Sequence, residues 1–120
     1  MMSYYCVSPI LVLTDYFTIS SLNTHSLQTS RDGTLKLAFS TCDGHLIESV
    51  LIPGGSRSTA CVSSQAGCPL NCTFCGTGKI PFKRNLTKSE IFDQIVTIQN
   101  KSRQIHNRSL SNIVYMGMGE

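Results

Sequence analysis

The stretch T-A-C-V-S-S-Q-A-G-C-P-L-N-C-T-F-C-G-T-G, residues 59–78, decides how this 120-residue chain is interpreted. It contains four of the six cysteines, and Cys68, Cys72 and Cys75 follow the spacing C-x3-C-x2-C. The other two cysteines are isolated in the sequence. This clustering favours a loop that binds a metal or a cluster over a disulfide framework.

The number of cysteines on the loop also carries information. A structural zinc site takes four protein ligands, and electron-transfer 4Fe-4S clusters are likewise held by four cysteines. Three cysteines would leave one iron open to a substrate or cofactor, which indicates chemistry. Two alternatives stay open, namely a zinc site completed by His45 or His106 and three unligated cysteines in the core.

The residues around the loop predict a β-α-β unit. A short strand over residues 58–63 leads into the loop, and Thr87 with Glu90 forms a capping box that starts a helix at Lys88. The helix is expected to run to about Arg103. Its predicted buried stripe consists of Ile91, Ile95 and Ile98, with Phe92 and Val96 beside them.

Residues 112–116 form a nearly all-apolar run, which is typical of a strand covered on both faces. Parallel pairing of this strand with residues 58–63 would bring two segments to the same, carboxyl-end edge of a sheet. These segments are the cysteine loop and the closing Gly117-Met118-Gly119-Glu120.

The sequence before the loop divides into two parts. Residues 34–40 and 46–52 alternate apolar and polar side chains around Asp43-Gly44, which predicts a β-hairpin. Residues 1–30 are rich in Ser and Thr and contain no cation, so a weakly structured segment is expected. We therefore divide the chain into this segment, a hairpin at 31–56 that leads into the core, and the first β-α-β portion of the core at 57–120.

Composition places limits on the class of protein. With 41% hydrophobic and 14% charged residues, the chain can bury one core. No Lys or Arg occurs before Arg31, and the longest apolar run, residues 10–13, is far below a membrane span. We therefore expect a soluble, cytoplasmic protein that does not enter a membrane.

Positive charge gathers in residues 76–108, where seven Lys or Arg face two acidic residues, a local balance of plus five. Such a patch attracts polyanions such as RNA. A solvated helix face with its flanking loops explains the same charges equally well. Charge by itself therefore does not decide between them.

The cysteine motif resembles the radical S-adenosylmethionine (SAM) signature. The longer strings at residues 59–68, 72–78 and 84–87 resemble the adenine carbon 2 RNA methyltransferases of that superfamily, the dual-specificity RlmN/Cfr-like family. The match runs from about Gln28 to Glu120. It implies an α/β fold that begins a radical SAM partial (β/α)6 barrel, preceded by the β-hairpin and truncated after the second barrel strand.

The resemblance also implies cofactors. Cys68, Cys72 and Cys75 match the three ligands of a 4Fe-4S cluster whose fourth iron is chelated by the amino and carboxylate groups of SAM. One electron then cleaves SAM to a 5′-deoxyadenosyl radical. Gly119 and Glu120 match the pair that holds the amino acid part of SAM, although a generic turn is the plainer interpretation of this pair.

Further roles follow from the resemblance alone. The family methylates a cysteine near the C-terminus, converts that methyl group to a carbon radical that attaches to adenine, and resolves the adduct through a transient disulfide with a second cysteine. Cys61 matches this second, resolving cysteine, whereas a buried structural thiol is the alternative. Glu48 lies in a segment that resembles the one bearing the proposed proton acceptor, although Glu is common on the open face of a strand.

The implied function is methylation of carbon 2 of an adenine in 23S ribosomal RNA and in transfer RNA, by a monomer that receives electrons from a donor such as flavodoxin. The methyl-carrying cysteine is missing, because neither Cys6 nor Cys42 lies in a matching segment. We therefore expect the isolated chain to be inactive. The alternatives are a purine carbon 8 methyltransferase of the same family and a non-catalytic, metal-binding RNA adaptor.

Overall fold

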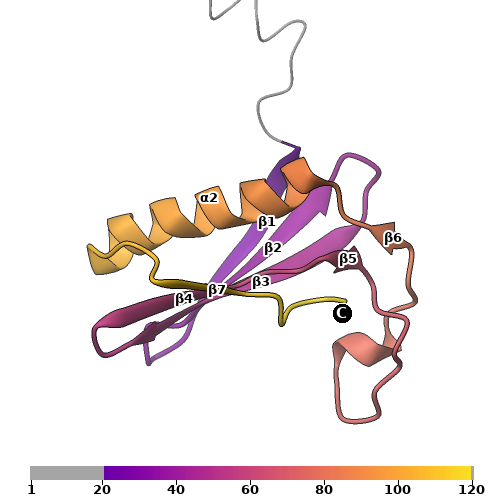
Figure 1. The fold of residues 1–120 in the computed structure, drawn as a ribbon, viewed down its shortest axis with the longest axis horizontal. Helices are drawn as coiled ribbons and strands as arrows, with labels where there is room; N and C mark the ends of the chain where they lie inside the picture. The colour runs from indigo at the N-terminus through magenta and orange to yellow at the C-terminus, as the bar shows by residue number, and fades with distance from the viewer. Residues whose placement is uncertain (1–20, 120) are drawn as a thin grey trace, which may run out of the picture.

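The computed structural model describes residues 21–119, which form a five-stranded main sheet, a small two-stranded sheet, one long helix and a loop that projects from the main sheet (Figure 1). Residues 1–20 and Glu120 lie outside the described residues. The elements, in chain order, are β1 (Leu22–Thr29), β2 (Leu35–Thr41), β3 (Leu46–Gly54), β4 (Arg57–Cys61), β5 (Gln65–Ala66), the 3-10 turn η1 (Thr77–Lys79), β6 (Arg84–Asn85), α2 (Lys88–His106) and β7 (Asn112–Val114). None of the helices in residues 21–119 is long and apolar enough to cross a membrane.

The main sheet has the strand order β1-β2-β3-β4-β7. Neighbours from β1 to β4 are antiparallel, and β7 is parallel to β4, with Ala60 opposite Ile113. The predicted hairpin is therefore confirmed as β2 and β3. Its turn depends on Gly44, whose φ of +82° lies in the left-handed region that glycine adopts without strain.

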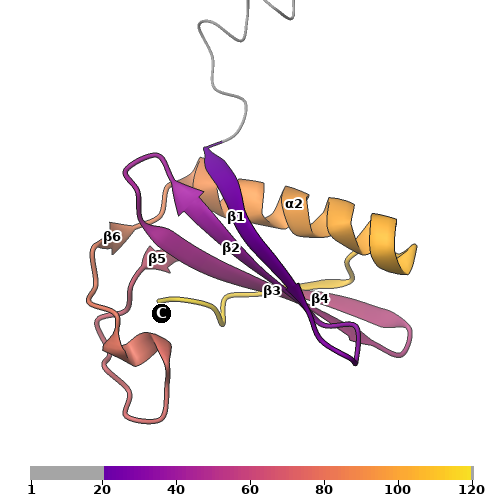
Figure 2. The same cartoon turned by 180° about the vertical axis from the view of Figure 1, so that it is seen from behind.

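The core lies between the sheet and α2, which crosses one face of the sheet (Figures 1 and 2). Alternate residues of β2 and β3 point to this face because side chains along a strand alternate between its two sides. The fully or nearly fully buried apolar residues include Leu35, Leu37, Phe39, Ile47, Leu51, Ala60 and Ile98.

The helix begins where the capping box predicted. The hydroxyl of Thr87 accepts the Glu90 amide, and the Glu90 carboxylate accepts the Thr87 amide at 2.8 Å. The buried face of α2 differs from the predicted one, however, because Phe92 and Val96 are exposed. Ile98 is buried as expected, and Ile91 and Ile95 pack partly against the core. Polar residues, Glu90 and Gln94 among them, fill the rest of the buried face.

The prediction of a weakly structured segment at 1–30 was wrong for residues 22–29, which form β1. This strand pairs with β2 from Leu22 opposite Thr41 to Thr29 opposite Leu35, with one irregularity between Thr24 and Ser26. Only Leu22 among its side chains is buried, so the strand has no apolar alternation that a sequence could reveal. Backbone pairing with β2 therefore stabilises this segment, and its side chains contribute little.

The last strand also differs from the prediction. β7 comprises three residues and lies at the edge of the sheet. Ile113, Tyr115 and Met116 are exposed, so the described residues do not cover the apolar run on both faces. The expected partial barrel is not confirmed. The observed architecture is a mostly antiparallel sheet with one helix and one parallel strand pair, β4 with β7.

One arginine connects three parts of this fold. The Arg84 guanidinium donates to both carboxylate oxygens of Asp43, at 2.7 and 2.8 Å, and to both of Glu90, at 2.8 and 2.9 Å. Asp43 lies in the hairpin turn, Arg84 at the end of the cysteine loop and Glu90 in the first turn of α2. These hydrogen bonds hold the pKa of Asp43 and that of Glu90 below their usual ranges.

We expect Arg84→Gln to lower the free energy of unfolding at pH 7 by about 3 kcal/mol, because it leaves the 2% exposed Glu90 without its cation. A carboxyl group whose pKa is lowered by folding stabilises the fold above its unfolded pKa and loses that contribution as the pH falls. The difference between wild type and variant should therefore shrink below about pH 4. Urea titrations at several pH values measure it.

The control for this prediction is Lys36→Gln, which breaks the ion pair of Lys36 with Glu48 at 2.8 Å. Both side chains are more than 40% exposed, so the cost should be below about 1 kcal/mol. Two outcomes would contradict the stabilising role of the Arg84 network. One is an equal loss of unfolding free energy in both variants, and the other is a loss in Arg84→Gln that does not change with pH.

Candidate functional site

The cysteine loop is closed at its base by the short pair β5 and β6. Ala66 lies opposite Arg84, and the loop closes further through the Lys83 amide, which donates to the Ala66 carbonyl at 2.8 Å. Gly67 follows with a φ of +75°. A Cβ atom there would lie 2.0 Å from the carbonyl oxygen of Pro81, so only glycine fits at this close approach of two chain segments.

The three cysteines of the loop, Cys68, Cys72 and Cys75, are half-buried. They line one cavity of about 250 Å³, together with Leu70, Phe74, Thr77, Tyr115, Met116, Gly117 and Gly119. The parallel pairing of β4 and β7 therefore brings the loop and the glycine-containing segment to one place, as the β-α-β prediction required. Backbone hydrogen bonds from Gly78 and Thr77 lower the pKa of Cys75, which favours its thiolate.

The three loop thiols do not all meet at one point in the described structure. Thiolates on one tetrahedral zinc lie roughly 3.8 Å apart. Within residues 21–119, one group of three possible metal ligands has all its donor atoms within 4.8 Å of one another, namely Cys42, Asp43 and Glu90. The two carboxylates of this group are hydrogen-bonded to Arg84. Cys68, Cys72 and Cys75 do not form such a group among the described residues.

The histidines of the zinc alternative lie elsewhere. The ring Nε2 of His106 is 3.0 Å from the Gly33 carbonyl, at the far end of α2. His45 lies 3.6 Å from a carboxylate oxygen of Asp43. Neither lines the cysteine cavity, so the described residues offer no histidine as a fourth ligand there.

A second, smaller cavity of about 170 Å³ adjoins Cys75 and is lined by Glu48, Cys61 and Cys75, among others. Cys61 lies opposite Val50 in the sheet, and both Glu48 and Cys61 project from the face that α2 does not cover. Burial raises the pKa of the Cys61 thiol, which keeps it protonated. Of the predicted site residues, only Glu120 lies outside the described part of the chain.

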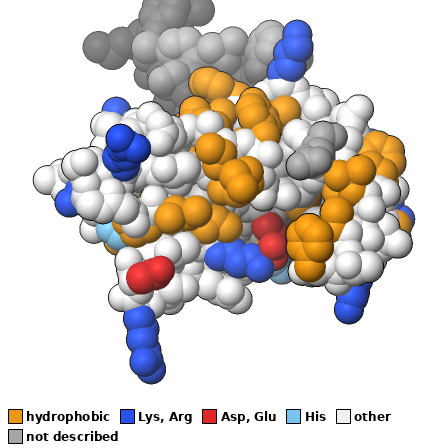
Figure 3. Space-filling model, turned by 60° about the horizontal axis from the view of Figure 1, so that its bottom comes forward, with side chains coloured by type: hydrophobic (Ala, Val, Ile, Leu, Met, Phe, Trp, Pro, Cys, Tyr) orange, Lys and Arg blue, Asp and Glu red, His pale blue; other side chains and the backbone are white. Residues whose placement is uncertain are grey.

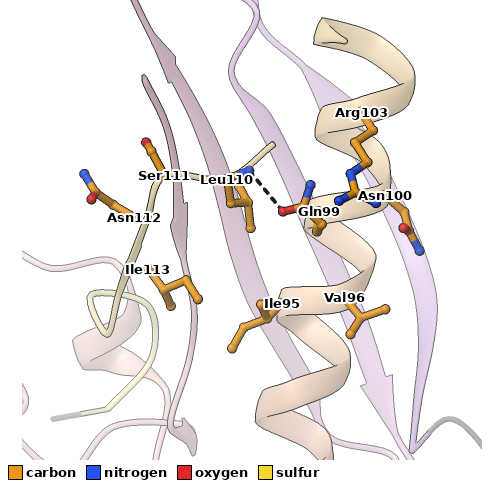
Figure 4. Close-up of a pocket in the computed structure, with 9 residues that line it drawn as sticks. All are labelled: Ile95, Val96, Gln99, Asn100, Arg103, Leu110, Ser111, Asn112 and Ile113. Carbon is orange, nitrogen blue, oxygen red and sulfur yellow. Dashed lines mark hydrogen bonds between the residues drawn. The ribbon is translucent and has the colours of Figure 1, made fainter. Parts of the chain in front are cut away.

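Hydrophobic side chains gather on the surface seen from below the sheet (Figure 3). Phe74, Tyr115 and Met116 are exposed and line the cysteine cavity. The sequence pattern placed Tyr115 and Met116 only in a buried strand, so their position in the wall of the cysteine cavity was missed. A larger cavity of about 450 Å³ lies between α2 and β7 (Figure 4), but it contains no cysteine, histidine or carboxylate.

No family model matches the chain. It is 51% identical over 109 residues to a "Probable dual-specificity RNA methyltransferase RlmN" of Flavobacterium johnsoniae, and 53% identical over 109 residues to a protein of the same name from Christiangramia forsetii. In each case the match covers 91% of this chain and 31% of the relative. A "Dual-specificity RNA methyltransferase RlmN" of Syntrophobacter fumaroxidans is 50% identical over 103 residues, 85% of this chain and 29% of that protein.

The structure is also similar to a solved one. The crystal structure of a radical SAM methyltransferase from Sphaerobacter thermophilus superposes with a TM-score of 0.87 and 39% identity, over 95% of this chain and 34% of that chain. The chain belongs to the RlmN family of radical SAM RNA methyltransferases. It spans about a third of the length of the RlmN relatives it matches.

Membership of the RlmN family confirms the resemblance proposed from residues 59–78. Radical SAM enzymes as a class use SAM and a 4Fe-4S cluster, and the three-thiol cavity is the part of this chain that fits such a cluster. All five described cysteines are free thiols, so no disulfide is formed among them. The individual roles of the site residues stay predictions.

The base of the loop gives a prediction from geometry alone. Gly67→Ala should lower the free energy of unfolding by about 2–4 kcal/mol. The alanine would have to adopt a left-handed backbone conformation, and its Cβ atom would clash with the backbone of Pro81. Trypsin should then cut faster after Lys79 and Lys83. Gly76→Ala is the matched control, since Gly76 has a φ of −59° and a Cβ there meets nothing within 4 Å. Similar stability of the two variants would refute this account of the loop.

Proposed function

We propose that this chain forms the cluster- and cofactor-binding part of an enzyme that methylates carbon 2 of an adenine in 23S ribosomal RNA and in transfer RNA. The observation that carries the proposal is the shared cavity of three thiols and the Gly117–Gly119 segment. The names of the RlmN relatives support an RNA substrate.

Each residue of the site has a proposed task. Cys68, Cys72 and Cys75 bind three irons, and Gly119 with Glu120 holds the amino acid part of SAM. A cluster and SAM held by these residues would supply one-electron cleavage of SAM to methionine and a 5′-deoxyadenosyl radical. The electron would come from an external one-electron donor such as flavodoxin.

Glu48 and Cys61 act later in the proposed reaction. Glu48 accepts the proton that leaves carbon 2 of the adenine, and its position beside the Cys61 cavity supports this role. The Cys61 sulfur attacks the sulfur of the cysteine through which the RNA adduct is joined to the protein. The bond between that sulfur and the transferred carbon breaks, and the carbon keeps the electron pair and takes up a proton. A disulfide is left on the protein and the methylated RNA is freed. The raised pKa of Cys61 fits a thiol that stays protonated until that step.

Anaerobic reconstitution of the chain with iron and sulfide should yield nearly four irons and four sulfides per protein, a cluster-type absorption band and no stoichiometric zinc. Cys72→Ala should abolish this cluster, because it removes one of three thiolates. Cys61→Ala is the matched control and should retain the iron. Zinc without sulfide would instead support the metal-binding RNA adaptor, and iron loss in Cys61→Ala would make Cys61 a ligand.

Methyl transfer can be tested in a chimera, in which residues 28–120 of this chain replace the corresponding segment of the Syntrophobacter fumaroxidans relative. We expect this chimera to form 2-methyladenosine in 23S ribosomal RNA and transfer RNA, measured by mass spectrometry of nucleosides from cells that lack the endogenous enzyme. A product of 8-methyladenosine would favour the carbon 8 alternative. No methylated product from the chimera, with an active unmodified relative, would overturn the proposal.

The same chimera tests the task of Cys61. Cys61→Ala should trap the protein covalently on RNA, because the thiol that resolves the adduct is gone. The adduct is detected as an RNase-sensitive band on a denaturing gel. Wild-type turnover in Cys61→Ala would show that the thiol is only structural.

A further inference from the structure

Two parts of the proposed site are joined by a single buried hydroxyl group, that of Ser63. Its Oγ donates to the backbone carbonyl of Glu48 at 2.6 Å and accepts the Met118 amide at 2.8 Å. Glu48 is the proposed proton acceptor, and Met118 lies between the two glycines of the proposed SAM-binding turn. The hydroxyl therefore bridges the strand that carries the acceptor and the turn that holds the cofactor.

Ser63 is itself held from the opposite side by Gln94 of α2. The Gln94 Oε1 accepts the Ser63 amide at 2.8 Å and the Ser49 hydroxyl at 2.6 Å. The Gln94 Nε2 donates to the Ser63 carbonyl at 3.0 Å and to the Glu90 carbonyl at 3.3 Å. All four hydrogen-bonding positions of the amide are thus used, at a side chain with no exposed surface.

The turn beyond β7 packs tightly against this serine. A Cβ atom at Gly117 would lie 2.5 Å from the Ser63 Oγ and 2.8 Å from the Val62 carbonyl oxygen. The Gly117 amide donates to that same carbonyl at 3.1 Å. The carbonyl of Met118 accepts the amides of Ser64 and Gln65, at 2.9 and 3.1 Å. The β4–β7 ladder ends at Val114, so these contacts hold the turn where regular strand pairing has stopped.

We propose that Ser63, oriented by Gln94, is a positioning residue that sets the SAM-binding turn against the strand of Glu48. The proposal rests on the proposed function, because it takes Gly119, which follows Met118 in this turn, as a SAM-binding residue. A hydroxyl with one donated and one accepted bond fixes both backbones at once, whereas an apolar side chain could only fill the space. Loss of the hydroxyl should therefore displace the turn and leave the cluster loop unchanged.

The test compares Ser63→Ala with Ser58→Ala in the reconstituted chain. Both serines are buried, at 0% and 1% exposure, but the hydroxyl of Ser58 has no hydrogen-bond partner among the described residues. Both variants should keep the iron content of wild type. Ser63→Ala should raise the dissociation constant of SAM about tenfold. This binding is measured from the change that SAM causes in the electron paramagnetic resonance signal of the reduced cluster. Ser58→Ala should bind SAM as wild type does.

Amide hydrogen exchange gives a second measurement, which needs no SAM and begins with the wild type alone. The Met118 amide of wild type should exchange at least about a hundredfold more slowly than an unstructured amide, although it lies outside every strand. In Ser63→Ala this protection should be lost, while protection within β2 and β3 stays. Exchange of Met118 at the unstructured rate in wild type would overturn the inference even if Ser63→Ala failed to fold.

The outcomes separate this inference from the proposed function. If wild type binds SAM and Ser63→Ala binds it equally well, the positioning role is wrong and the proposed SAM site stands. If wild type binds the cluster and shows no response to SAM, the proposed SAM site fails for this chain. The protection of Met118 then decides by itself whether Ser63 holds the turn.

Discussion

The parallel pairing of β4 with β7 is the constraint on which the site depends. The cysteine loop leaves the sheet soon after β4, and the glycine-containing segment leaves it after β7. Because parallel strands end at the same edge, both segments arrive at one cavity, although more than forty residues separate Cys68 from Gly117 in the sequence. An antiparallel pairing would place them at opposite ends of the sheet.

The helix that connects these strands packs on the sheet partly through buried polar residues. Its buried face contains Glu90 and Gln94 at the positions nearest the site, with Ile98 further along. Burial of polar groups costs free energy unless they are paired, and here both are fully engaged, Glu90 by Arg84 and Gln94 by Ser63 and Ser49. Directional bonds define the positions of the loop and the turn more narrowly than apolar contact could.

Several elements were predictable because their signals are local. The capping box of Thr87 and Glu90, the hairpin around Asp43-Gly44 and the C-x3-C-x2-C motif each depend on residues close together in the sequence. β1 was missed because its side chains are nearly all exposed, and its stability comes from backbone pairing with β2. The buried face of α2 was assigned wrongly at Phe92 and Val96 because hydrophobicity alone cannot reveal that a paired glutamate or glutamine is buried in their place.

The sequence by itself determined the family, the C-x3-C-x2-C spacing of the three proposed cluster ligands, and the order of strand, loop, helix and strand. These depend on residue identity and short spacing, which a linear pattern records. Only the tertiary structure decided that Glu48 and Cys61 border the cavity of Cys75, that Arg84 joins the hairpin to the helix, and that Ser63 bridges two backbones. Those contacts join residues 6 to 55 positions apart, and their geometry exists only after the sheet has set its register and the helix has packed on it.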